Sequence, residues 1–426
     1  MRFQTKLFLD RLLGNFICFL LIPIVFVLGK IFRIDHSINS QNVKNIAVAK
    51  YYGLGTITQS VPMLKALKSK YPNAKLFFIT RPQNKELVSL IPYIDTILFI
   101  NDSNLFALLK TSLKLIFDLR FKYPKIDLFF DLELFSSFGV LISLFSMARN
   151  RLGFFWAKGT NFKAHIYTHL MYFNFNRPVR LSHVQLARLG GADINFPTTL
   201  LPFEIPQPAK ISAHKKLDAL FGAKKKKILA INVNASELSL ARRWPISRFS
   251  KIAQMFLSKD ICILLLGAPS EKNYTQQVID KISDEKLKEN IFNVCGYFSL
   301  TELLYLMPSF DCFLTNDTGL MNLAYAQNAK VISIYGNNLP EMVHVDNGVN
   351  IALYKPSYCS PCLYIFDSPP CKNRRVCMLN ISVEDVACAV IEVINRPKPA
   401  RKEDDIDCLI SDDKNYLLGT LRRMKQ

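Results

Sequence analysis

Acidic residues are scarce in this sequence. The 426 residues include 34 Asp and Glu against 54 Lys and Arg, so the formal net charge is +20. Such an excess of positive charge favours anionic partners, which include nucleic acid, a membrane surface and phosphorylated substrates. The sequence contains no zinc-finger array and no RNP-type motif, and its lysines are spread along the chain. We therefore expect no nucleic acid partner and rank a membrane surface or a phosphate-rich substrate first.

Low-complexity and collagen-like segments are absent too. With 50% hydrophobic and 21% charged residues, the composition is that of a globular protein long enough for two domains and a small appendage. Ten cysteines in a chain of this length do not form a small disulfide scaffold. Five lie singly in apolar runs and are predicted to be buried: Cys18, Cys262, Cys295, Cys312 and Cys388.

The N-terminal segment contains the longest apolar run, Leu12 to Leu28. Its length is borderline for a membrane span, which needs about 20 apolar residues. Basic residues flank both ends, so their distribution gives no orientation. We predict that residues 1–43 form a membrane-associated helix, spanning the bilayer or lying in its interface. A core helix of a soluble domain and a signal peptide are the alternatives.

Residues 44–205 alternate between apolar strands and helix-like segments, which predicts a parallel sheet with helices on both faces. Gly53 and Gly55 lie where the first strand meets a helix, but the third glycine of the dinucleotide fingerprint is missing. A tight turn without a ligand is the commoner explanation. A helix is expected from Pro82 to Leu90. The predicted strands are Ile46–Ala49, Lys75–Thr80, Thr96–Ile100, Asp127–Glu133 and Arg151–Phe154.

Clustered prolines between Pro197 and Pro208 indicate a linker to a second domain of the same kind, residues 206–396. Residues 397–426 form a tail or a helix that returns to the first domain. The predicted strands of the second domain are Ile228–Asn232, Ile261–Leu266, Cys312–Leu314 and Val331–Tyr335.

A polar turn, Thr315 to Gly319, follows the strand that begins at Cys312 and precedes a helix. Ligands of open α/β sheets bind at such carboxyl ends of strands, and the free amides of a helix start favour anions. The alternative is that these residues only cap the helix. Arg242 and Arg243 are candidates to neutralise phosphates, or are simply solvated at the surface.

Several segments together resemble glycosyltransferase family 9, the heptosyltransferase-like enzymes of lipopolysaccharide assembly. They occur in the family's order over roughly residues 45 to 390, a span set by the outermost matching segments. The resemblance implies an α/β fold of GT-B architecture. Two Rossmann-like doubly wound domains then face a cleft, with the acceptor on the first and the nucleotide-sugar on the second. The segments are residues 48–56, 62–67, 93–95, 234–236 with 243–245, 316–324 and 359–362.

The resemblance also implies a donor site in the second domain, and no metal or other cofactor is implied for catalysis. Asp317 is anionic, so we expect it to position sugar or ribose hydroxyls or to cap the helix. Glu271 is expected to accept ribose hydroxyls, or to be solvated. The predicted donor-binding residues are Asn234, Ser236, Arg242, Glu271, Asn316, Asp317, Thr318, Gly319, Leu320 and Gly336.

The candidate base is where the sequence departs from the family. Family heptosyltransferases carry Asp in the first glycine turn, and here Thr56 occupies that position. A hydroxyl cannot act as a base near neutral pH, and the family's His is replaced by Asn322. Asp131 and Glu133, at the exit of their strand, are the candidate substitutes, although either could instead cap the next helix. We list Glu133, Asp131 and Thr56 as the predicted catalytic residues.

Four clustered cysteines, Cys359, Cys362, Cys371 and Cys377, have a spacing compatible with a structural zinc site. Free thiols or a loop staple are the alternatives.

The predicted function is that of a metal-independent inverting glycosyltransferase. It would transfer heptose or a related sugar from an ADP-heptose-like or other nucleotide-sugar to lipopolysaccharide or another membrane-linked glycan. We expect it on the cytoplasmic face of the inner membrane, held there peripherally or by one N-terminal anchor. The alternative is a non-catalytic nucleotide-sugar-binding or scaffold protein of polysaccharide assembly, and a sugar-nucleotide epimerase of the same architecture ranks third.

Overall fold

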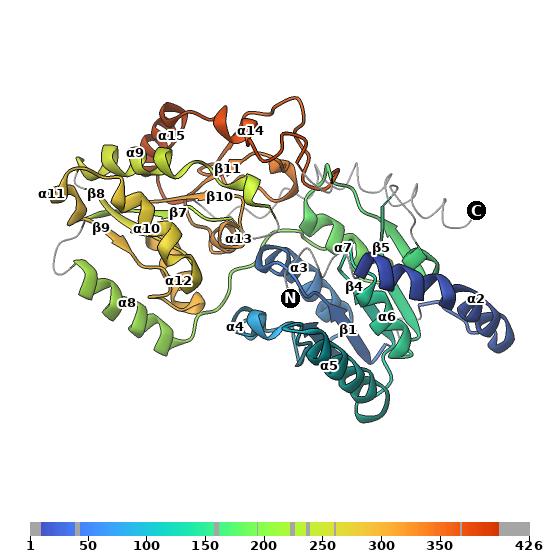
Figure 1. Ribbon diagram of the computed structural model, residues 1–426. Coiled ribbons are helices and arrows are strands. Elements are labelled where there is room, and N and C mark those ends of the chain that lie inside the picture. The colour runs from blue at the N-terminus through green and yellow to red at the C-terminus, as the bar shows by residue number, and fades with distance from the viewer. Residues whose placement is uncertain are drawn as a thin grey trace. The chain divides into compact units, whose positions relative to one another are not determined.

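The chain folds into two compact units (Figure 1). Unit 1 comprises the described residues up to Thr199, and unit 2 comprises the described residues from Leu200 to Pro399. Most of the predicted C-terminal tail or returning helix, residues 397–426, lies outside the described residues. The computed structural model describes residues 10–38, 43–156, 162–193, 195–221, 226–235, 239–259, 261–366 and 369–399.

Unit 1 contains a parallel six-stranded sheet with the order β3-β2-β1-β4-β5-β6. All five strands predicted from the sequence are present, although β4 is shorter than expected. The sixth, β6, was missed because its only fully buried residue is Met171, so it lacks a continuous apolar run. The strands are β1 (Asn45–Ala49), β2 (Lys75–Thr80), β3 (Thr96–Phe99), β4 (Leu128–Asp131), β5 (Asn150–Phe155) and β6 (His169–Tyr172).

Helices cover both faces of this sheet. On one face, Leu115 and Ile142, from two different helices, pack with Phe129 of β4. On the other face α3 and α7 contact each other, and Gly190 at the end of α7 lies against Phe130. The helix predicted from Pro82 to Leu90 is only a turn, η3 (Pro82–Asn84), followed by the single turn α4. The helices are α2 (Asn15–Phe32), α3 (Leu54–Lys70), α4 (Lys85–Val88), α5 (Leu105–Phe117), α6 (Phe138–Phe145) and α7 (Val179–Leu189).

The parallel sheet of unit 2 has the order β9-β8-β7-β10-β11-β12. Counted from its own first strand, this is the order found in unit 1, and both are the doubly wound order of dinucleotide-binding folds. The two short strands β9 and β12 were not predicted. The strands are β7 (Lys227–Asn232), β8 (Ile261–Leu265), β9 (Ile291–Asn293), β10 (Cys312–Asn316), β11 (Val331–Tyr335) and β12 (Ile351–Tyr354).

Strand β10 extends further than the sequence suggested. Thr315 and Asn316 were assigned to the polar turn, but both continue the strand and are completely buried. Burial is tolerated because their polar atoms are hydrogen-bonded, as when the Thr315 hydroxyl donates to the carbonyl oxygen of Asn316 at 2.8 Å. The turn therefore begins only at Asp317.

The main core of unit 2 lies between its sheet and two helices, α9 and α15. Trp244 is fully buried there and donates its indole N–H to the carbonyl oxygen of Ile381 at 3.0 Å. Four of the five cysteines predicted to be buried are so, but Cys388 is exposed because it lies on the outer side of α15. The helices are α8 (Gln207–Phe221), α9 (Ile246–Leu257), α10 (Lys272–Asp280), α11 (Glu285–Lys288), α12 (Leu300–Leu306), α13 (Gly319–Ala326), α14 (Val376–Leu379) and α15 (Val383–Asn395).

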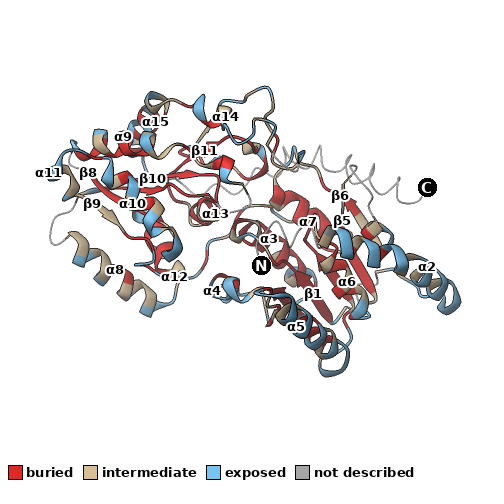
Figure 2. Ribbon diagram, viewed as in Figure 1, coloured by how far each residue is buried: buried red, intermediate tan, exposed pale blue. Residues whose placement is uncertain are grey.

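Helix α2 differs from all of these because little of it is buried (Figure 2). It is apolar over Leu12–Phe32 and long enough to cross a membrane, and Cys18 is its only buried residue. Helix length and composition agree with the predicted N-terminal apolar helix.

Candidate functional site

In each sheet the strand order reverses at one point, between β1 and β4 in unit 1 and between β7 and β10 in unit 2. The loops that leave these strands diverge, and open α/β sheets bind their ligands at such switch points. Most of the predicted site residues lie on these loops. Each unit therefore carries its own candidate site, and the two are described separately.

The centre of the unit 2 site is an ion pair between Arg242 and Asp317. The Arg242 guanidinium lies 3.3 Å from Asp317 Oδ2, and the side-chain amide of Asn338 donates to the same oxygen at 2.9 Å. All three side chains are buried. Removing an arginine and a carboxylate from water is costly unless each has a partner. Asp317 thus keeps the Arg242 guanidinium at the carboxyl end of β10, where it can attract an anionic ligand.

Asn316 links three segments of the unit 2 site through its side chain. Its side-chain amide donates to the carbonyl oxygens of Val233 and Asn234, at 2.9 and 3.1 Å. Its side-chain oxygen accepts from the backbone N–H of Trp244 at 3.1 Å. These bonds join the loop after β7 and the segment after η6 (Leu240–Arg242) to β10. Asn316 thus fixes the segment that follows Arg242, and its predicted role in donor binding stays a prediction.

The start of α13 has a side-chain cap and also backbone N–H groups that lack a partner within the helix. Thr318 is the N-cap residue, and its hydroxyl accepts from the N–H of Met321 at 3.3 Å. Asn322, which occupies the position of the family's His, donates to the carbonyl oxygen of Thr318 at 2.9 Å. Gly319 and Leu320 form the first turn, whose amides have no partner within the helix and favour an anion. Asp317 does not act as the cap.

Three asparagine oxygens on the loops after β7 and β11 have no hydrogen-bond partner among the described residues. They are the side-chain oxygens of Asn234, Asn337 and Asn338, and all three residues are buried. Buried acceptors are normally satisfied, so such a group indicates room for donors such as the hydroxyls of a sugar or a ribose. Sequence analysis missed Asn337 and Asn338, although their position directly after β11 and Gly336 was a usable signal.

Tyr364 was also missed. It lies close enough to Asp317 and Arg242 to sense their charges, and burial raises the pKa of its phenol to about 12. The phenol is therefore protonated at neutral pH and can donate a hydrogen bond. No motif pointed to it, because it lies in the irregular segment between β12 and α14.

Three predicted donor residues remain, and the structure describes two of them, Glu271 and Gly336. The Glu271 carboxylate accepts from the backbone N–H of Ala268 at 2.8 Å, so it closes the turn after β8. Gly336 faces Met378 and Cys377 so closely that a Cβ atom would clash with both. Packing accounts for a glycine at this position, and its role in donor binding stays a prediction. Ser236 lies outside the described residues.

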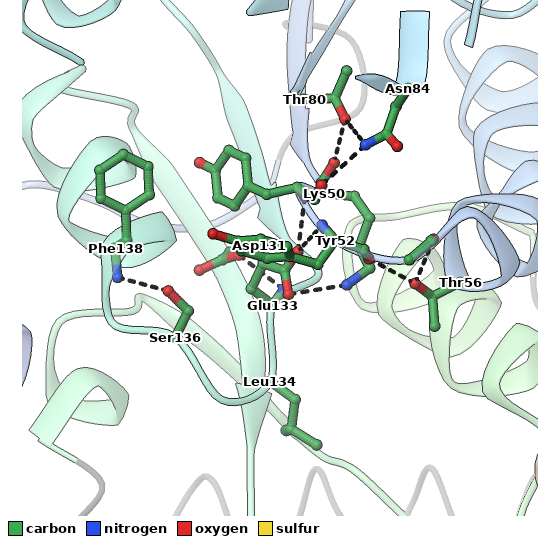
Figure 3. Close-up of polar contacts among 12 residues, drawn as sticks. Lys50, Tyr52, Thr56, Thr80, Asn84, Asp131, Glu133, Leu134, Ser136 and Phe138 are labelled. Carbon is green, nitrogen blue, oxygen red and sulfur yellow. Dashed lines mark hydrogen bonds and ion pairs between the residues drawn. The ribbon is translucent and has the colours of Figure 1, made fainter. Parts of the chain in front are cut away.

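In unit 1, Glu133 lies at the switch point, two residues beyond β4 (Figure 3). One of its oxygens accepts from the backbone N–H groups of Tyr51 and Tyr52, at 2.7 and 3.0 Å. The other lies 3.0 Å from the Lys50 ammonium. Glu133 is buried, with 8% of its surface exposed. It binds the turn that precedes α3, and Thr56 follows in the first turn of that helix.

Asp131 is more enclosed than Glu133, with no exposed surface. It accepts from the hydroxyl of Tyr167 at 2.6 Å and from the N–H of Glu133 at 3.0 Å. Burial raises the pKa of Asp131 to about 6. Lys163 lies nearby, and burial lowers the pKa of its ammonium, which donates to the carbonyl oxygens of Glu133 and Leu134. Asp131 is thus in a suitable pKa range for a base but is covered by its own neighbours.

Thr56 lies in the first turn of α3 and bonds back to the turn before the helix. Its hydroxyl donates to the carbonyl oxygens of Tyr52 and Gly53, both at 3.0 Å. Gly53 has a φ of +87°, which side chains rarely adopt, and a Cβ atom there would lie 2.8 Å from the Thr56 hydroxyl. The glycine and the threonine together fix the turn, in keeping with a tight βα turn.

The cysteines Cys359, Cys362, Cys371 and Cys377 are all free thiols. Burial raises the pKa of Cys362 to about 11, and the three other thiols are close enough to raise it further. Among the residues that the structure describes, no group of three His, Cys, Asp or Glu side chains is placed to hold a metal ion. The zinc interpretation stays a prediction, which metal analysis of the purified protein would test.

The comparisons with known proteins agree on one family. The model of the family described as glycosyltransferase family 9 (heptosyltransferase) matches residues 140–372. A lipooligosaccharide heptosyltransferase 2 from Haemophilus influenzae is 28% identical over 146 residues, which cover 33% of this chain and 41% of that protein. The enzyme of the same name from Campylobacter jejuni serotype O:6 is 24% identical over 345 residues, 78% of this chain and 94% of its own length.

Two solved structures share the fold. A glycosyl transferase family 9 protein from Veillonella parvula superposes with a TM-score of 0.68 at 16% identity, covering 84% of this chain and 99% of its own. The ADP-heptose lipopolysaccharide heptosyltransferase II of Escherichia coli gives a TM-score of 0.64 at 16% identity, with coverages of 83% and 98%. These likenesses confirm the predicted GT-B architecture of two doubly wound domains.

Proposed function

The chain belongs to glycosyltransferase family 9, and from that premise we propose that it transfers heptose or a related sugar from an ADP-linked donor. The acceptor that we propose is lipopolysaccharide or another membrane-linked glycan, and the reaction inverts the anomeric centre. Two relatives named lipooligosaccharide heptosyltransferase 2 and a similar structure named for ADP-heptose support this choice of donor and acceptor.

The observation that carries the proposal is the buried pair of Arg242 and Asp317 at the start of α13. A sugar transferase must stabilise a departing diphosphate, and a guanidinium together with helix-start amides supplies positive charge where that charge develops. Asn234, Asn337 and Asn338 then offer acceptor oxygens to the sugar and ribose hydroxyls. Asp317 orients Arg242 rather than facing the phosphates itself.

We propose that this arrangement replaces a metal ion at the diphosphate. Removal of divalent cations with EDTA should leave the transfer rate unchanged, because Arg242 and the α13 dipole already supply the compensating charge. A rate that falls on chelation and returns with added Mg²⁺ or Fe²⁺ would refute the metal-independent proposal.

For the base we propose Glu133. Its carboxylate binds the N–H groups of Tyr51 and Tyr52, so it lies at the glycine turn in which family members place their aspartate. Thr56 itself cannot take the proton, since a neutral hydroxyl is not a base near neutral pH. Its hydroxyl bonds instead to the carbonyl oxygens of Tyr52 and Gly53. Asp131 is fully buried and supports Glu133 through the backbone, so it acts as a positioning residue.

Calorimetric titration of the full-length protein with ADP and UDP tests the donor site. We expect ADP to bind and UDP to bind more weakly, since the related structure is named for an ADP-sugar. Absence of binding to either nucleotide would overturn the proposal. A transfer assay with ADP-heptose and a heptose-deficient lipopolysaccharide then tests the reaction.

One observation favours a second candidate, a nucleotide-sugar-binding protein without transferase activity. Both Thr56 and Asn322, which replace the family's Asp and His, are engaged in structural hydrogen bonds. This candidate predicts normal ADP binding together with no transfer above background in either the wild type or the Glu133→Gln variant.

We also propose that the protein works at the cytoplasmic face of the inner membrane, where α2 supplies the apolar contact. Unit 1 carries this helix, and the excess positive charge of the chain suits an anionic lipid surface.

A further inference from the structure

Both ends of α2 are fixed to the same compact unit. Before the helix, the Asp10 carboxylate accepts from the backbone N–H groups of Ser137 and Phe138, at 2.9 and 3.0 Å. After it, the ring of His36 bonds to the carbonyl oxygen of Arg149 at 2.8 Å. In between, Cys18 packs with Val140 of α6 and with Tyr167. The helix therefore lies along unit 1, from the residues before α6 to those after it.

A spanning helix would have to place its ends on opposite sides of a hydrocarbon layer about 30 Å thick. With 18 residues, α2 is about 27 Å long. Its two ends cannot be on opposite sides while both bond to unit 1. Yet its large apolar side chains, among them Phe16, Phe19, Phe26 and Phe32, are exposed to water. These side chains would be shielded from water in the interfacial layer of a bilayer, with the helix axis in the membrane plane.

A second exposed apolar surface lies on α5 and the turn η4 (Asp118–Lys122) that continues it. Phe106, Leu109, Leu113, Phe117 and Phe121 follow one another at intervals of three or four residues, which places them on one face of a helix. All five are more than half exposed, and Phe106 reaches 76%. We name these five residues the α5 stripe.

The opposite side of α5 and η4 is buried against the core of unit 1. Leu115 and Leu119 pack into the core cluster of the sheet, so the helix cannot rotate to hide the α5 stripe. An isolated exposed apolar residue needs no explanation, but a continuous stripe of large residues marks an interaction surface.

The charges beside the α5 stripe identify its partner. Between residues 105 and 125 there are five basic side chains and one acid, Asp118, which is already paired with Lys114 at 2.6 Å. An anionic lipid surface attracts such a set by about 1 kcal/mol for each basic residue near it. A second copy of this chain would present the same positive rim across a symmetric interface and would be repelled.

Helix α6 connects the two surfaces. It contacts α5 on one side and the segment leading into α2 on the other, and all three lie on the same side of the sheet. Phe145 and Met147, at the end of α6, are exposed as well. Figure 2 shows α2 and α5 as the two helices of unit 1 with the most exposed surface.

We propose that unit 1 docks on an anionic bilayer through α2 and the α5 stripe together, with α2 lying in the interface. This inference rests on the proposed membrane location and is independent of the transfer reaction. The α5 stripe inserts its aromatic side chains between headgroups, while Lys110, Lys114, Arg120 and Lys122 contact lipid phosphates. Docking would hold the enzyme over the lipid-linked end of its acceptor.

Vesicle flotation of the full-length protein tests the α5 stripe. The triple variant Phe106→Ser, Leu113→Ser, Phe117→Ser should bind vesicles containing phosphatidylglycerol about tenfold more weakly than the wild type, because three apolar contacts are lost. The matched control is Ile211→Ser, Met255→Ser, Ile391→Ser, three exposed apolar residues of unit 2, and it should bind like the wild type. Equal binding by the α5 variant and the wild type would overturn the proposal.

Charge and self-association are separated in the same experiment. Replacing Lys110, Lys114, Arg120 and Lys122 with Gln should weaken binding to anionic vesicles but not the weak binding to phosphatidylcholine alone. If sedimentation shows instead that the α5 triple variant converts a dimer to a monomer, with vesicle binding intact, the stripe is an interface between copies. Turnover of a detergent-dispersed acceptor should stay at the wild-type level, so a failed transfer reaction would be recognised independently.

The position of α2 has its own test. An epitope tag added before Met1 should be open to protease from the side on which unit 1 lies when the protein is bound to sealed vesicles. A tag that is protected until detergent is added would show a spanning helix and overturn the interfacial placement.

Discussion

At its switch point unit 2 keeps one arginine and one aspartate in contact, whereas unit 1 surrounds each of its carboxylates with donors from its own chain. Around Arg242 and Asp317, three asparagine oxygens have no protein partner among the described residues. In unit 1, by contrast, Glu133 is bound by two backbone N–H groups and by Lys50. The same strand order thus supports one site whose asparagine oxygens stay open to a ligand and one whose carboxylates are bound by donors of the chain.

The difference follows from what each unit has to do in the proposed reaction. A diphosphate is bound by charge and by many hydrogen bonds, so its site must leave polar atoms available. A base has to be held in place and shielded until a hydroxyl reaches it, so contacts that fix its orientation are an advantage. Glu133 has such contacts and is buried, with 8% of its surface exposed.

The largest effect is expected for Glu133→Gln. Glutamine can still accept from Tyr51 and Tyr52 but cannot take a proton, so kcat should fall about 1,000-fold, within the usual range for a general base. Initial rates at saturating donor measure this, and ADP affinity should not change. Glu289→Gln, an exposed glutamate of unit 2, is the control. An unchanged kcat would mean that Glu133 only holds the turn before α3.

Arg242→Gln should weaken ADP binding about 100-fold, because truncation of a buried charged partner also leaves Asp317 uncompensated. Calorimetry measures the affinity, and thermal unfolding shows whether unit 2 remains folded. Arg248→Gln is the matched control, since its guanidinium bonds to the carbonyl oxygens of Leu379 and Ile381. Equal losses in both variants would show a general effect of arginine removal and erase the contrast between the units.

Asn316→Ala should act on stability more than on chemistry. The variant leaves the carbonyl oxygens of Val233 and Asn234 and the N–H of Trp244 without a partner, which should lower the free energy of unfolding by about 3 kcal/mol. Urea unfolding measures the loss. A variant of normal stability with weak ADP binding would place Asn316 in contact with the donor, as its sequence position suggested.

Asp131→Asn should change how stability depends on pH. The pKa of Asp131 is raised to about 6 by burial, so its stabilising contribution is complete below its usual pKa and is lost as the pH rises through 6. Relative to the wild type, the neutral variant should therefore gain up to about 2 kcal/mol between pH 4 and pH 7. Urea unfolding of both proteins across this range measures it. A constant difference would show that Asp131 ionises normally.

Both sheets could be predicted from the sequence because their central strands are continuous apolar runs, as in β1 and β7. The missed strands β6, β9 and β12 lie at sheet edges, where half-buried positions break that run. The end of β10 was misplaced for a different reason. Thr315 and Asn316 look like turn residues, and only their tertiary hydrogen bonds make them part of the strand.

The candidate sites could also be predicted only in part from the sequence. Arg242, Asp317 and the start of α13 could be found because each lies next to a recognisable turn. Tyr364 could not, since its place near Asp317 depends on how an irregular segment bonds to Gly336 and Asn337, the residues after β11. The burial that separates Asp131 from Glu133 was likewise invisible, because the two residues are equivalent in the sequence pattern.

The bond between Asp10 and Ser137 joins residues 127 positions apart, which has a consequence for synthesis. Helix α2 leaves the ribosome first, but its partners on α6 follow only after more than a hundred residues. At roughly 5–20 residues per second the helix waits on the order of ten seconds with its apolar surface uncovered. During that interval a nearby lipid surface is the contact available to it, so the nascent chain can reach the membrane before unit 1 has folded.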